Sequence, residues 1–99
     1  MSKIKIKIDG KAIKNIETYH IQGYEGTKNP ARIEAEITAK RHFKLAVGSI
    51  LKNICFYIYS GGHYYSRQGR VARVKNETSF GGIKHGELEL YLSNVEMRI

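Results

Sequence analysis

The residues best suited to chemistry lie between positions 40 and 75, where eight side chains are basic and none is Asp or Glu. This segment accounts for the whole formal net charge of +8, because the rest of the chain holds nine basic and nine acidic residues. A charge block of one sign repels itself unless an anionic partner neutralises it. The segment therefore predicts a surface that binds an anion. Its basic residues are Lys40, Arg41, Lys44, Lys52, Arg67, Arg70, Arg73 and Lys75.

Tyrosines are interleaved with these charges, and that combination is typical of single-strand nucleic-acid binding. Bases stack on aromatic rings while basic side chains attract phosphates. A purely structural reading is also open, because tyrosine is a common strand residue and arginine keeps strand exteriors in water. Strict alternation would place Arg70 and Arg73 on opposite strand faces, unless Gly69 shifts the phase. The predicted site for nucleic acid or an acidic partner comprises Tyr57, Tyr59, Tyr64, Tyr65, Arg67, Arg70, Arg73 and Lys75.

Enzyme signatures are absent from the sequence. The four histidines are not spaced as metal ligands on one strand or helix, and Cys55 is the single cysteine, so a zinc site is not expected. Glu34 and Glu36 share a strand face, but they alternate with Arg32 and Thr38, as solvated residues do. The two Gly-Gly pairs lack the Lys-Ser/Thr ending of a phosphate-binding loop. We predict no catalytic residues, no metal, no cofactor and no enzymatic activity.

The bulk composition predicts one globular domain, residues 1–99, with 41% hydrophobic residues. No apolar run approaches the roughly 20 residues that a membrane span requires. The first residues lack the apolar region of a signal peptide, and one cysteine cannot form an internal disulfide. We therefore expect a cytoplasmic or virion location and no membrane span.

Alternating hydrophobicity marks the strands of the first half. Residues 3–8 alternate Lys and Ile and are followed by Asp9-Gly10, a favoured type I′ hairpin turn. The return strand is expected from 11 to about 21, with Asn15 in a bulge. After a loop at 23–30, residues 31–39 alternate again, with Ala and Ile on the inward face. Lys3, Lys5 and Lys7 form a basic row of the kind that protects an edge strand, or that meets a neighbouring subunit.

Residues 40–53 are ambiguous: their apolar spacing fits a short helix near 41–52, but Phe43, Leu45 and Val47 also fit a strand that ends at a Gly48-Ser49 turn. We favour the strand because β-branched residues surround it. The later expected elements are strands at 54–59, 64–75 and 87–92, a Gly61-Gly62 turn, a bulge or bend at Gly69, a loop at 76–82 and an alternating tail at 95–99. The fold class predicted is all-β, a small antiparallel β-barrel or sandwich of six to seven strands.

The order of these parts resembles the first barrel domain of phage tail-hub and baseplate proteins, the late-control and spike-bearing hub family. The likeness rests on four motifs. They are the strand and Asp-Gly-Lys turn at 4–11, the small-residue strand at 31–37, the Leu-x-Val-Gly element at 45–48 with the strand after it, and the Gly-x-Val-x-x-Val pattern at 69–74. The resemblance implies a barrel that docks on other tail or assembly subunits, as a homo-oligomer or in a hetero-complex.

Three functions follow as expectations. The first is a non-enzymatic structural protein of a phage tail or related contractile injection machine. The alternative is a barrel of the oligonucleotide-binding kind that uses its basic Tyr/Arg face. A further alternative is a small phage-encoded inhibitor that places its basic face on a host enzyme.

Overall fold

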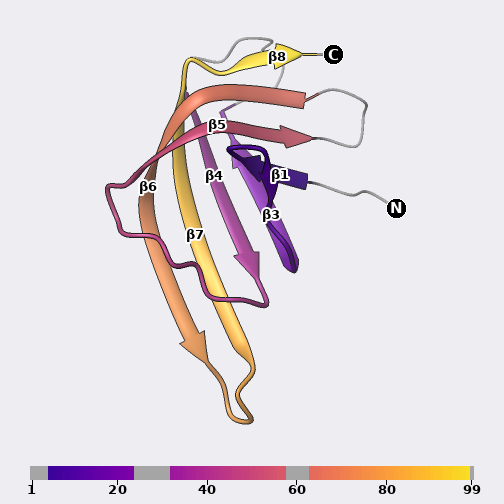
Figure 1. Ribbon diagram of the computed structural model, residues 1–99, viewed down its shortest axis with the longest axis vertical. Coiled ribbons are helices and arrows are strands. Elements are labelled where there is room, and N and C mark those ends of the chain that lie inside the picture. Colours follow the sequence, from indigo (N-terminus) through magenta and orange to yellow (C-terminus); the bar gives the residue numbers. More distant parts are fainter. Residues whose placement is uncertain (1–4, 24–31, 58–62, 99) are drawn as a thin grey trace.

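The computed structural model describes residues 5–23, 32–57 and 63–98 (Figure 1). In these residues all regular structure is β-strand, which confirms the predicted all-β class and excludes the helix near 41–52. None of the described residues forms a helix that could cross a membrane. The strands are β1 (Lys5–Ile8), β2 (Lys11–Ala12), β3 (Ile16–Gln22), β4 (Arg32–Ala39), β5 (Ile50–Tyr57), β6 (His63–Thr78), β7 (Lys84–Ser93) and β8 (Glu96–Arg98).

These strands form one antiparallel sheet that curls into a half-barrel (Figure 1). The order across the sheet is β2-β1-β5-β6-β7-β4-β3, and β8 pairs separately with the first residues of β6. The two ends of this path, β2 and β3, are separated in the chain by residues 13–15 alone. The curl therefore brings the first and last strands of the sheet together at that point. The pairing of β8 with β6 shows that part of the alternating tail at 95–99 joins an earlier strand.

The hairpin after β1 is confirmed, but its return strand is much shorter than predicted. Asp9 and Gly10 have φ angles of 53° and 80°, the two positive values that a type I′ turn requires. The return strand β2 pairs with β1 through two residues only. Asn15, expected in a bulge, has φ 62° and lies between β2 and β3, which pairs with β4 instead. A left-handed residue at this point turns the chain from one end of the sheet to the other.

Strict alternation on β4 and β7 builds the centre of the core, as the sequence predicts. Ile33, Ala35, Ile37 and Ala39 of β4 are buried, and so are Leu88, Leu90 and Leu92 of β7. The register places Ile37 opposite Leu88 and Ala35 opposite Leu90. The concave face of the sheet is therefore apolar, and the alternate side chains of both strands point to the convex face, called the outer face below.

Residues 40–49 form neither the favoured strand nor the helix. They connect β4 to β5, and these strands are separated in the sheet by β7 and β6, so the segment must run across both. It follows the free edge of β6, where the Asn76 side chain accepts a hydrogen bond from Phe43 N at 2.8 Å and donates one to Phe43 O at 2.9 Å. A side chain thus takes the place of backbone pairing at Asn76, whereas Gly48 N and Val71 N form backbone hydrogen bonds across the same edge. The turn lies one residue earlier than predicted, at Val47 and Gly48, and Ser49 N donates to Ala46 O at 3.0 Å to close it.

The long strand β6 departs from its predicted form at three points. It continues to Thr78, through part of the predicted 76–82 loop, and the turn proper lies at 79–83. The bulge lies between Val71 and Arg73, where the register with β7 shifts, and not at Gly69. Gly69 is instead a site of close packing, because an added Cβ would lie 2.4 Å from Leu92 Cδ2 and 2.6 Å from Ile54 Cδ1. The predicted Gly61-Gly62 turn falls outside the described residues.

Candidate anion-binding surface

Two irregularities in β6 bring its arginines to one side of the sheet. Arg67 and Gln68 are both exposed, so the alternation changes phase just before Gly69, where Ser66 Oγ lies 2.7 Å from Gln68 O. The bulge after Val71 changes the phase again. As a result Arg67, Arg70 and Arg73 are all exposed, whereas strict alternation would place Arg70 and Arg73 on opposite faces.

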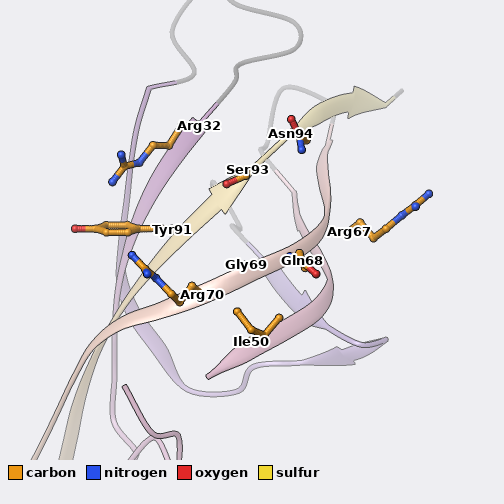
Figure 2. A pocket seen from close by; sticks show the side chains of 9 residues that line it. All are labelled: Arg32, Ile50, Arg67, Gln68, Gly69, Arg70, Tyr91, Ser93 and Asn94. Carbon is orange, nitrogen blue, oxygen red and sulfur yellow. The ribbon is translucent and has the colours of Figure 1, made fainter. Parts of the chain in front are cut away.

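A pocket of about 480 Å³ opens on the outer face where β4, β6 and β7 meet (Figure 2). At one end the Tyr91 ring lies between two guanidinium groups, with Arg32 Cζ 4.6 Å and Arg70 Cζ 5.8 Å from the ring centroid. Arg67 lies at the opposite end and points away from Tyr91 (Figure 2). We call this hollow the arginine pocket. It is lined by Arg32, Ile50, Arg67, Gln68, Gly69, Arg70, Tyr91, Ser93 and Asn94.

The arginine pocket retains positive charge that the protein does not neutralise. Among the described residues no carboxylate forms an ion pair with Arg67 or Arg70. Arg32 lies 3.4 Å from Glu34, and both side chains are about half exposed, so this pair is weak. Contact with an aromatic face contributes about 0.5–1 kcal/mol at an exposed site and restrains the guanidinium. Tyr91 therefore orients Arg32 and Arg70 and leaves their donor groups open to an anion.

Two of the predicted site residues are instead held in ion pairs within the sheet. Arg73 contacts Glu87 and Glu89 of β7, each at 3.2 Å, and Lys75 contacts Glu77 at 3.1 Å. The hydrogen bond from Arg73 holds the pKa of the Glu87 carboxyl below its ordinary value. The same bond is the largest cause of the raised pKa of Arg73. The two carboxylates satisfy much of the charge that Arg73 would offer to an external anion, whereas the half-exposed pair of Lys75 is weak, like that of Arg32.

The ion pair of Arg73 predicts a contribution to stability that is lost at acid pH. Because the folded-state pKa of Glu87 is depressed, its contribution is present above the ordinary glutamate pKa of about 4.3 and is lost as pH falls through the folded-state pKa. Arg73→Gln should raise the pKa of Glu87 toward its ordinary value and reduce the loss of unfolding free energy between pH 6 and pH 3. A carboxyl NMR titration and urea unfolding at each pH measure both quantities. An unchanged Glu87 pKa in the variant would contradict the assignment.

The predicted tyrosines that the structure describes divide between two environments. Tyr64 lies in the core, stacked on Phe56 with ring centroids 5.3 Å apart, so its prediction as a binding residue is wrong. Tyr57 and Tyr65 are half-buried on the outer face. Tyr57 lies beside His63, at 5.0 Å between ring centroids, and Tyr65 donates a hydrogen bond to Asn53 Oδ1 at 2.7 Å. Tyr59 lies outside the described residues.

Of the lysines predicted to mark an open edge, Lys7 is paired on both sides. β1 pairs with β5 on one side and with β2 on the other, at Lys7 and Ile8. Lys7 Nζ instead lies 5.7 Å from the centroid of the Tyr57 ring. It therefore adds a cation to the outer face beside the half-buried tyrosines. Lys5 is exposed on the same strand, and Lys3 lies outside the described residues.

The sequence analysis did not assign Arg32, Gln68, Tyr91, Ser93 or Asn94 to the predicted site. One signal was available for Tyr91, because the Glu-Leu-Glu-Leu-Tyr-Leu run places it outward, at the end of a row of carboxylates. Within the described ranges no group of three or more His, Cys, Asp or Glu side chains is placed to hold a metal ion. The arginine pocket is thus a site of basic and neutral polar groups, suited to binding an anion.

Comparison of the sequence with protein-family models and with curated proteins finds no match.

Proposed function

We propose that this chain is a non-enzymatic protein that binds single-stranded nucleic acid on the outer face of its half-barrel. The observation that supports this proposal best is the arginine pocket, where no carboxylate of the described residues pairs with Arg67 or Arg70 and Tyr91 orients Arg70. A phosphate is the natural ligand of such groups, because guanidinium donors match its oxygens in bidentate fashion.

The neighbouring residues supply the surface for bases. Both faces of Tyr91 are covered by guanidinium groups, so bases would stack on the arginine planes or on Tyr57 and Tyr65 rather than on Tyr91 itself. Each stacked base contributes about 1–3 kcal/mol, and this contribution does not depend on the base sequence. Arginine planes also stack on bases and contribute through cation–π contact. The expected binding is therefore electrostatic and tolerant of base identity.

A titration with a fluorescent oligothymidylate at two salt concentrations tests the proposal. Contacts from Arg32, Arg67 and Arg70 to about three phosphates predict a slope near −2 for log K against log salt. Affinity should then be micromolar or tighter at 50 mM salt and about twentyfold weaker at 200 mM. The absence of binding at 50 mM salt would refute the proposal.

A second candidate function, a structural subunit of a phage tail or related contractile assembly, is favoured by a different part of the molecule. The β6–β7 turn carries Phe80, which is fully exposed, and Ile83, which is 62% exposed. Apolar side chains at the tip of a hairpin can pack into a neighbouring subunit. Light scattering at high protein concentration tests this function, and a strict monomer with no ring or partner from its own gene neighbourhood would count heavily against it.

A further inference from the structure

We infer that the arginine pocket receives the phosphorylated end of a single strand, and not an internal stretch of it. The inference rests on the proposed function and concerns the same pocket. It comes from the carboxylates that border the pocket, because three line the hollow on one side and one lines the hollow on the other.

Beyond Tyr91 the outer face is lined with carboxylates. The register places Glu34 opposite Tyr91, and Glu36 opposite Glu89 on the next outward row of β4 and β7. These side chains line a small hollow beside Tyr91, together with His20 and Gln22. Glu34 and Glu89 each contact an arginine, but Glu36 is exposed and forms no ion pair among the described residues. A polyanion that continued past Tyr91 would run over this row and be repelled.

On the opposite side the described residues form a hollow that a strand can follow. Arg67 and Asn94 line both the arginine pocket and a second hollow of about 300 Å³, which is completed by Tyr65 and Glu96. The two hollows therefore adjoin each other at Arg67 and Asn94. This side carries one carboxylate and leads toward the half-buried aromatic side chains of β5 and β6. A strand would therefore enter at Arg67 and end beside Arg70 and Arg32.

A terminal phosphate suits this end of the pocket better than an internal phosphodiester. A phosphate monoester carries a charge of about −1.5 to −2 at pH 7 and offers three acceptor oxygens, whereas a diester carries a single charge. Two guanidinium groups held on one tyrosine ring can meet that larger charge. The pocket volume of about 480 Å³ lies within the range of small-ligand sites.

Four probes of one length test the inference: oligothymidylate with a 5′-phosphate, with a 3′-phosphate, with neither, and as a closed circle. We expect at least one phosphorylated end to bind about tenfold tighter than the unphosphorylated strand, and the circle to bind weakest. Equal affinity for all four would overturn the end preference and leave single-strand binding intact. Failure of all four to bind would overturn the proposed function as well. Thymidine monophosphate is the competitor, and competition as strong as that of the phosphorylated strand would assign the pocket to free nucleotides and overturn the inference.

Matched variants separate the two ends of the pocket. Arg70→Gln should abolish the preference for the phosphorylated end, whereas Arg67→Gln should weaken all four probes by a similar factor. Glu36→Gln removes a carboxylate from the repelling row and should raise the affinity for the circle several-fold. Glu36 is exposed, so thermal melting should show an unchanged fold. If Glu36→Gln does not change binding of the circle, or Arg70→Gln keeps the end preference, the inference is wrong.

Discussion

Replacing Arg67 and Arg70 together with glutamine should lower the affinity for single-stranded DNA about 100-fold at 50 mM salt. Neither side chain has an internal counter-charge among the described residues, so both are available to phosphates. A factor of about ten for each lost contact corresponds to about 1.4 kcal/mol. The loss of two phosphate contacts should also make the slope of log K against log salt less negative by about 1.4. Fluorescence anisotropy across a salt series measures both effects.

The chain provides a matched control for this experiment on the same strand. Arg73→Gln with Lys75→Gln removes the same net charge from β6, but these residues already pair with Glu87, Glu89 and Glu77. We expect this control to lose less than about threefold in affinity. If the two double variants lose affinity equally, binding follows net charge alone and the arginine pocket has no special role.

The contrast between these two pairs shows what the sequence could predict about the site. An acid-free segment identified Arg67 and Arg70 from composition alone. It could not separate them from Arg73, because the carboxylates that pair with Arg73 lie on β7 and meet it only through the β6–β7 register. Arg32 was missed for the same reason, since β4 reaches the pocket through its pairing with β7. Local composition predicts the charge, and strand pairing determines how much of it remains free.

The fold shows the same division between local and distant causes. The core faces of β4 and β7 were predictable because period-two alternation is a property of each strand alone. The form of residues 40–49 was not predictable, because it depends on the two strands that separate β4 from β5 in the sheet. The inward residues of β6 before Arg67 alternate in one phase, and those after Gln68 alternate in the other. Tyr64 was therefore misplaced, because strict alternation back from the exposed Arg70 would place it on the outer face. A bulge that shifts the inward–outward alternation, such as the one after Val71, leaves no clear trace in composition.

Phe56→Ala should cost about 3–5 kcal/mol of unfolding free energy, the largest stability effect we expect from one substitution. Phe56 is fully buried at the concave face of β5. Its ring stacks on Tyr64 at 5.3 Å and lies 6.4 Å from Tyr19 on β3, so it joins strands that are distant in the sheet order. Truncation would leave a cavity between rigid strands that cannot close on it. Urea unfolding followed by circular dichroism gives the value.

Phe80→Ala is the matched control, because the same side chain is removed from a fully exposed position at the β6–β7 turn. Its unfolding free energy should stay within about 0.5 kcal/mol of the unaltered protein. A domain of this size has only about 5–15 kcal/mol of stability, so the loss expected at Phe56 is a large fraction of the total. Similar costs at the two positions would mean that the concave face of the sheet is not the core. The outer face would then lose its assignment as the surface left for a partner, since the two faces are defined by the same alternation.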